Sequence, residues 1–425
     1  MHVAGTLACL IAPALLLLWS HGGRLRGSPW PAAATAFAYL VAQVRDALAN
    51  VRAPSEWDFG AFWLYAHVAR AHGNLYDPQA FAHVRLPFAI ESDFAASVLA
   101  VGFPYPPPSI ALFLPLGGID GFRNGLIAWY VARALAFLIA IVALQRAFFP
   151  RDGARGAVLV AALAAMLPSL ASDTAQAQTN VFLLALVALA FLGRERTWGA
   201  CLGALAIWVK PYAVALLLCD VAAGRLRRSI AAALTIAASL AASVALVGIA
   251  TFATYWRSNP AGREPSSAFT ESVNQSLLAV VLRATHAPLG AHVAPLQQPA
   301  FVAVALALLA LATLACARYR RESDLCFALA LELGLLLYPG TLASYGTACV
   351  LPLLVLWSRR TALPLRSAGA ALVAAAVFAL QGPLHAGFAA NALLFGACAL
   401  AMPAAAKNGP GRARPRPSAV RVRAA

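Results

Sequence analysis

The feature that most constrains the fold of this chain is a succession of long apolar runs rich in Ala, Leu and Val. Several of these runs reach the roughly 17–25 residues that a helix needs to cross the hydrocarbon core of a bilayer. Soluble domains are roughly 45–50% apolar, whereas 61% of these 425 residues are hydrophobic and the mean hydropathy is +0.74. The chain is therefore expected to be a polytopic membrane protein.

Only helices and closed β-barrels satisfy the backbone within lipid, and barrel strands alternate apolar with polar residues. The runs here are continuous, so we predict an all-α bundle of about twelve transmembrane helices. Ten of them are expected near residues 125–147, 157–171, 180–193, 198–219, 229–250, 299–317, 324–339, 346–358, 363–381 and 386–403, after 3–19 and 103–118. Prolines interrupt 103–118 and 198–219, so either segment could be broken or re-entrant, and the sequence leaves open whether each makes a full span.

The net charge of +16 comes from 32 Lys and Arg against 16 Asp and Glu. In a soluble chain this excess would suggest a nucleic-acid partner, but here most basic residues lie in short turns and in the tail. Cytoplasmic loops of membrane proteins are rich in Lys and Arg. We therefore predict no nucleic-acid partner, cytoplasmic termini, and outer positions for the two long loops, residues 20–103 and 251–298.

The expected organisation is one integral membrane domain over residues 1–403, followed by a basic, disordered cytoplasmic tail over 404–425. Within the first outer loop, residues 32–50 and 58–72 are expected to form interfacial helices, because polar side chains interrupt their apolar faces. The seven cysteines show no metal-ligand or redox spacing in the sequence, so they are interpreted as small buried hydrophobes. No carboxylate cluster predicts a bound metal.

The first candidate for chemistry is Asp58, which lies between Trp57 and Phe59 just after the first apolar run. A carboxylate that is partly removed from water gains proton affinity, which suits a general base. An aspartate at the start of a helix is also a common N-cap, and the two roles are compatible. Glu56 is a weaker alternative for the base.

The second candidate is Lys210, which lies in the middle of an apolar run and precedes Pro211. A lysine at that depth is costly unless it faces an anion or a polar cavity, and snorkelling to the interface is the alternative. Glu332 also lies in the middle of a span. It could pair with Lys210 or line a polar cavity, and the sequence leaves both readings open.

Further polar candidates lie between spans: Gln178 and Asn180 in one turn, and Asn274, Arg283 and His286 in the second outer loop. Each could equally be a capping or solvated group. No phosphate-binding loop, zinc-binding histidine pair, nucleophile elbow or dinucleotide fingerprint occurs.

An ordered set of motifs resembles glycosyltransferase family 87. The set runs along nearly the whole chain, as Asp58-Phe59, Gly73-Asn74-Leu75-Tyr76-Asp77-Pro78, Phe103-x-Tyr105-Pro106-Pro107, Gln178-x-Asn180, Lys210-Pro211, Arg225–Arg228 and Asn274-x-Ser276. Two segments depart from the family pattern. The family's Gly-Gln-x-x-Asn-type loop reads Ala177-Gln178-Thr179-Asn180, and its late Ser-Pro-x-Ser-Trp-type loop reads Leu342-Ala343-Ser344-Tyr345-Gly346.

The resemblance implies a GT-C membrane enzyme, a hexosyltransferase similar to mannosyltransferases, located in the bacterial cytoplasmic membrane. It implies a polyprenyl-phosphate sugar as donor and a membrane lipid or glycan as acceptor, with no cofactor beyond that donor. The proposed base of the family corresponds to Asp58. The expected substrate-binding residues are Lys210, Tyr105, Gln178, Asn180, Asn274, His286 and Tyr345.

The expected reaction is an inverting single displacement at the outer membrane surface. Asp58 takes the proton of an acceptor hydroxyl, and Lys210 is the first choice to stabilise the leaving phosphate. Trp63 and Tyr105 are candidates for stacking on the sugar. Two other classes stay open: a lipid or solute transporter or flippase, for which a broken helix with a lysine is equally natural, and a lipid-linked glycan ligase or polymerase.

Overall fold

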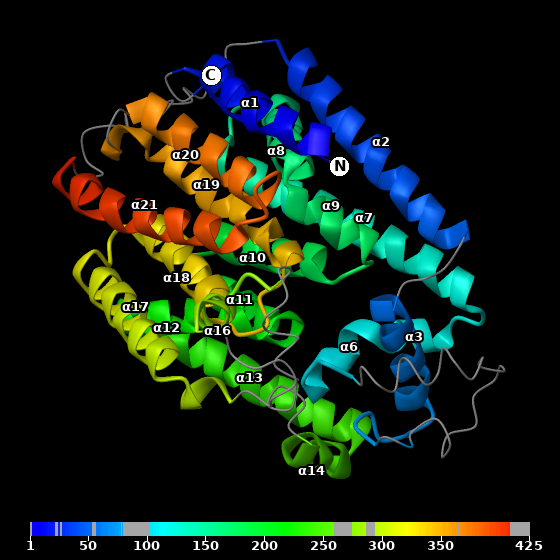
Figure 1. Cartoon of the computed structure of the whole chain (residues 1–425). Coiled ribbons are helices and arrows are strands. Elements are labelled where there is room, and N and C mark those ends of the chain that lie inside the picture. The colour runs from blue at the N-terminus through cyan, green and yellow to red at the C-terminus, as the bar shows by residue number, and fades with distance from the viewer. Residues whose placement is uncertain are drawn as a thin grey trace, which may run out of the picture.

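A computed structural model describes residues 2–21, 24–25, 28–52, 57–77, 79, 103–258, 274–285, 294–363 and 366–408. These residues form a helical bundle, as the apolar runs predict (Figure 1). Its described strands, β1 (Ser20–His21) and β2 (Arg24–Leu25), are two residues long and pair with each other. His286 and Glu56 lie outside the described residues.

The first half of the chain contains α1 (His2–Trp19), α2 (Trp30–Arg52), α3 (Trp57–Arg70), η1 (Pro107–Ser109), α6 (Ile110–Phe113), η2 (Leu114–Gly118), α7 (Phe122–Phe148), α8 (Gly153–Met166), α9 (Pro168–Ala175), α10 (Asn180–Leu192), α11 (Thr197–Val209), η3 (Pro211–Ala213) and α12 (Val214–Ala222). The second half contains α13 (Leu226–Val247), α14 (Ile249–Ser258), α16 (Leu277–Ala284), η5 (Pro295–Gln297), α17 (Pro299–Arg318), α18 (Ser323–Leu337), η6 (Ala343–Cys349), α19 (Val350–Ser358), η7 (Arg360–Ala362), α20 (Arg366–Gln381) and α21 (Gly387–Asn408).

Among the described residues, four helices are long and apolar enough to cross a membrane: Phe122–Phe148, Leu226–Val247, Pro299–Arg318 and Gly387–Lys407. A fifth candidate is the pair α8 and α9, which bend by 70° where Pro168 interrupts the run. Shorter apolar helices occupy most of the other expected spans. The multi-pass character is confirmed, but the count of twelve is not, because several runs fold as short or broken helices.

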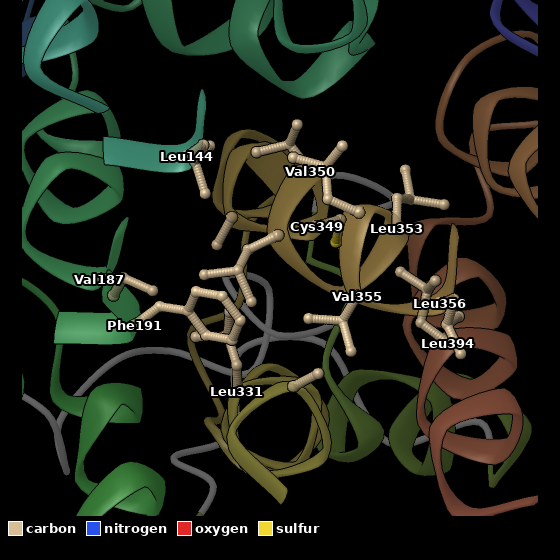
Figure 2. Packing of buried hydrophobic residues seen from close by; sticks show 14 of the residues in the cluster. Leu144, Val187, Phe191, Leu331, Cys349, Val350, Leu353, Val355, Leu356 and Leu394 are labelled. Carbon is tan, nitrogen blue, oxygen red and sulfur yellow. The ribbon is translucent and has the colours of Figure 1, made fainter. Parts of the chain in front are cut away.

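The core is centred on α19, which is buried along almost its whole length. Figure 2 shows Val350, Val355 and Leu356 of this helix among side chains from α7, α10, α18 and α21. A short helix covered on all sides by others needs no polar face, and its sequence VLPLLVLWS has none. Outer helices such as α13 and α17 are instead largely exposed, and both are long and apolar enough to cross a membrane.

Two of the predicted breaks position the candidate site. The helix over 198–219 ends at Val209, and Lys210 is extended, with φ −147° and ψ 121°. The cause is local, because the residue before a proline is disfavoured in the helical region. Within residues 103–118 the chain forms three short helical pieces, η1, α6 and η2, and the first of them begins at Pro107. These pieces do not make a full span.

The two helices expected at the interface differ from each other. On α2, polar side chains contact protein: Gln43 donates to the carbonyl of Ala165, and Asn50 donates to Tyr130 and to the carbonyl of Ala175. Its apolar side chains Phe37, Val41, Val44 and Leu48 are exposed. On α3, by contrast, residues 59–69 are all buried. The amphipathic interpretation of α3 is therefore wrong, because both faces of the helix are buried, and η2, α6 and α7 are among the elements that contact it.

The C-terminal helix α21 extends to Asn408, five residues beyond the expected end of the membrane domain at residue 403. Pro403 lies inside this helix without ending it. The basic residues from position 409 onward lie outside the described part of the chain.

Candidate active site

Asp58 lies in the first turn of α3 and faces the turn between α9 and α10. Its Oδ2 accepts a hydrogen bond of 2.6 Å from Nε2 of Gln178. Burial raises the pKa of Asp58 above the usual carboxyl range, while the bond from Gln178 and the charge of Lys210 act in the opposite direction.

The contact from Gln178 continues into a chain of side-chain hydrogen bonds. Oε1 of Gln178 lies 3.5 Å from the hydroxyl of Tyr105, which also shares a 3.0 Å bond with the hydroxyl of Thr179. The ammonium of Lys210 then donates to the hydroxyl of Tyr105 at 2.8 Å and to that of Tyr345 at 2.7 Å. Five residues predicted from the sequence, Asp58, Tyr105, Gln178, Lys210 and Tyr345, therefore form one continuous network.

Lys210 is 3% exposed and lies where η3 follows the end of α11. The rings of Tyr105 and Tyr345 also face its ammonium, with centroids 4.8 and 4.1 Å from Nζ. An ammonium has three N–H donors, and the two tyrosines accept two of them. Among the described residues no acceptor takes the third N–H of Lys210.

Neither the snorkelling of Lys210 nor its pairing with Glu332, both of which the sequence left open, is found among the described residues. No salt bridge among the described residues includes Lys210 or Glu332. Glu332 is fully buried in α18 and lies beside Cys349. The helix itself approaches η3 closely, since a Cβ on Gly334 would meet the carbonyl oxygen of Tyr212 at 2.3 Å. A glycine is required there because the backbones touch.

The turn that carries Gln178 is held by a buried ion pair that the sequence interpretation missed. Arg133 of α7 binds Asp173 of α9 at 2.8 Å and also donates to the carbonyl of Gln178. Oδ1 of Asp173 accepts from the backbone and side-chain nitrogens of Asn180, at 3.0 and 2.8 Å. Asp173 follows the apolar run over 157–171 in a polar segment, whereas Arg133 lies inside the run over 125–147, where ionisable residues are rare. That signal was present in the sequence.

The same turn is fixed from a second side. Ala177 adopts a left-handed backbone conformation with φ 49°, which is uncommon for a residue with a side chain. Its carbonyl accepts a 2.7 Å bond from the indole of Trp129. Asn180 therefore supports this turn through its bonds to Asp173, and its described hydrogen bonds do not join the network that includes Asp58.

Asn274 lies in a different cluster. Its side chain donates to the carbonyl of Pro339 and accepts from the backbone of Ser276, and its backbone pairs with Leu342. These bonds attach the start of α16 to the turn before η6. Arg283 donates to the carbonyl of Asn274, and Trp63 is buried with its indole bonded to the carbonyl of Ile119. The described hydrogen bonds of these two side chains do not join them to the Asp58–Lys210 network.

A cavity of about 90 Å³ borders the same segment, η6. It is lined by Gln275, Leu342, Ala343, Gly346, Gln381, His385, Gly387 and Asn391. Gly346 follows Tyr345 directly, so one short element contributes to the network and to the cavity. The buried Nε2 of Gln381 has no partner among the described residues, which leaves a hydrogen-bond donor in the cavity wall.

The model of glycosyltransferase family 87 matches residues 103–345, which is more than half of the chain. This chain belongs to glycosyltransferase family 87. The matched region contains Tyr105, Gln178, Lys210 and Tyr345, and the fold brings Asp58, which lies before it, to Gln178. No curated protein and no solved structure matches the chain. Membership of the family makes it a membrane glycosyltransferase in general terms.

Proposed function

We propose that this family 87 protein transfers a hexose, mannose-like, from a polyprenyl-phosphate sugar to a lipid or glycan acceptor at the outer face of a bacterial cytoplasmic membrane. The observation that carries the proposal is the continuous network from the Asp58 carboxylate through Gln178 and Tyr105 to the Lys210 ammonium. This network links Asp58, the candidate base, to Lys210, the candidate phosphate-binding cation, through a continuous series of hydrogen bonds.

In the proposed reaction, Asp58 takes the proton of the acceptor hydroxyl while that oxygen attacks the anomeric carbon. The bond from this carbon to the phosphate oxygen breaks, and polyprenyl phosphate leaves with the electron pair. The configuration at the anomeric carbon inverts. Gln178 holds Oδ2 of Asp58, while Oδ1 has no partner among the described residues and is the oxygen proposed to receive the proton.

The phosphate needs positive charge rather than an acid, because it leaves as a stable anion. Lys210 retains one donor and lies in a buried site, where a fixed cation stabilises developing charge more strongly than in water. The polar cavity beside η6 offers amide groups and an imidazole without a charged side chain in its described lining. This chemistry fits the hydroxyl groups of a neutral sugar.

The experiment is a transfer assay with purified protein, a panel of polyprenyl-phosphate sugars and membrane-lipid acceptors. We expect transfer by the wild type and a loss of at least about 100-fold in Asp58→Asn, since general-base catalysis contributes about 10²–10⁴-fold. Asp46→Asn is the matched control, because Asp46 is an exposed residue on α2. Undiminished transfer by Asp58→Asn would remove Asp58 as the base.

The same preparation separates the other classes. A transporter would move lipid or solute across vesicles without forming a glycosidic bond, and the breaks at Pro168 and Pro211 are compatible with one. A glycan ligase or polymerase would transfer a preassembled glycan rather than one hexose. Analysis of the product mass decides between these outcomes.

A further inference from the structure

Three cysteine side chains from three separate helices converge far from the network described above. They are Cys219 near the end of α12, Cys316 near the end of α17 and Cys326 in the first turn of α18. Their Sγ atoms all lie within 4.8 Å of one another, and those of Cys219 and Cys316 are 3.3 Å apart. All three residues are buried. Their sequence spacing gives no sign of this cluster, because Cys219 lies 97 residues before Cys316.

The size of the cluster suits a metal ion. A metal–thiolate bond is about 2.3 Å long, so three sulfurs around one ion in a plane lie about 4 Å apart. Among the described residues no fourth Cys, His, Asp or Glu side chain completes the group. Structural Zn²⁺ requires four ligands, whereas soft thiolate ligands also select Cu(I).

The surroundings of the cluster are compatible with ion entry and with thiolate charge. Two narrow cavities of about 10 Å³ border Cys219, and one of them is also lined by Asp220, Arg225 and Arg228. Such a volume holds about one water molecule. Arg225 contributes positive charge near Cys316 and Cys326. The Arg-rich turns at 225–228 and 318–321 flank the cluster, and the positive-inside rule assigns such turns to the cytoplasm, where thiols stay reduced.

We propose that Cys219, Cys316 and Cys326 form a three-thiolate site for Cu(I) that joins the ends of α12, α17 and α18. In this structure the thiols of Cys219 and Cys326 donate to the carbonyls of Cys326 and Tyr319. Binding displaces the thiol protons, so copper uptake is accompanied by proton release. The site is independent of the proposed transfer reaction, since none of its residues belongs to the network that includes Asp58.

The test uses the full-length protein in detergent, reduced and under anaerobic conditions, with Cu(I) supplied from a chromogenic chelator. We expect the wild type to withdraw one equivalent of Cu(I) and Cys316→Ser to bind at least tenfold more weakly. Cys398→Ser is the matched control, because Cys398 is another buried cysteine outside the cluster. Equal retention by the wild type and Cys316→Ser would overturn the proposal.

Two further measurements do not depend on a substitution. X-ray absorption at the copper edge of the loaded wild type is expected to show three sulfur neighbours, and nitrogen or oxygen neighbours would contradict the site. Cu(I) is also expected to raise the thermal unfolding temperature of the wild type, because a ligand that binds only the folded state stabilises it. Tighter retention of Zn²⁺ than of Cu(I), or a Cys219–Cys316 disulfide in protein isolated without reductant, would overturn the assignment.

Discussion

At the scale of single residues, Asp58 is held by one hydrogen bond and removed from most of its water. Those two influences act oppositely on its pKa, and burial is the larger. The neutral amide of Gln178 fixes the orientation of the Asp58 carboxylate through a hydrogen bond and adds no charge. The Asp58 carboxylate therefore has a higher proton affinity than an ordinary exposed carboxylate, and a general base requires this property.

The raised pKa predicts an acid limb in the pH profile. A base acts only when it is deprotonated, so activity is expected to fall as the pH decreases through the pKa of Asp58. Because burial raises this pKa, the fall should begin above the value of about 4 that is usual for an aspartate. The measurement is kcat/KM against pH for the wild type and Asp46→Asn, which should share the limb. An unchanged limb in the residual activity of Asp58→Asn would contradict the assignment.

Lys210 gives a second prediction at this scale. Lys210→Met keeps the length of the side chain and removes its charge, so we expect kcat to fall by about 10²–10³-fold if the ammonium stabilises the leaving phosphate. Product inhibition by polyprenyl phosphate should weaken in parallel. Lys407→Met, at the exposed end of α21, is the control. A variant that unfolds more easily but retains its kcat and its product inhibition would show a structural role only.

At the scale of elements, the turn between α9 and α10 is the piece that fixes the site. The Arg133–Asp173 pair joins α7 to α9, and Asp173 also caps the first turn of α10 through Asn180. The break at Lys210-Pro211 and the close contact at Gly334 place the lysine at the height of Tyr345. The backbone is therefore held at the α9–α10 turn and at the Lys210-Pro211 break, and these two segments set the distance between Asp58, the proposed base, and Lys210, the proposed cation.

Breaking the buried pair is expected to be costly. Asp173→Asn leaves the Arg133 guanidinium buried without its counter-charge, which typically costs about 3–5 kcal/mol. The exposed pair of Arg45 and Asp46 is the internal comparison, and Asp46→Asn should change stability by less than about 0.5 kcal/mol. Unfolding of the purified variants in detergent measures both. Similar losses in the two variants would show that the buried pair has no special role.

At the scale of the whole molecule, the chain is a membrane bundle in which the presence of an apolar run does not by itself decide whether that helix is exposed or enclosed by protein. Long exposed helices such as α13 and α17 carry the membrane signal, while α19 and α3 are short and enclosed by protein. The proposed reaction places the network and the cavity beside η6 on the outer side, and the Arg-rich turns on the inner side.

This sidedness predicts a labelling pattern. Gln297→Cys in η5 is expected to react with a membrane-impermeant maleimide in intact cells, since the loop over 251–298 is assigned to the outer side. Arg227→Cys should react only after permeabilisation. Both positions are exposed, so access to the side chain does not differ between them. The reverse pattern would invert the proposed topology.

The site residues show how far sequence reasoning reached. Gln178 and Lys210 were selected as polar residues at a turn and a break, whereas Tyr105 and Tyr345 were selected through the family resemblance. The structure brings all four into one network with Asp58, although their roles stay proposals. Arg133 and Asp173 were missed, even though Arg133 is a charge within the apolar run over 125–147. Asn274 was selected as a substrate contact, but its side chain fastens one turn to another.

The sequence by itself determined the membrane class, the helical fold, the break before Pro211 and the family, because apolar length, proline chemistry and motif order are local properties. Only the tertiary structure decided which polar residues meet. The contacts of Asp58 with Gln178, of Tyr105 with Lys210 and of Lys210 with Tyr345 join residues 120, 105 and 135 positions apart. Such contacts depend on how the helices pack, and the three converging cysteines depend on the same packing.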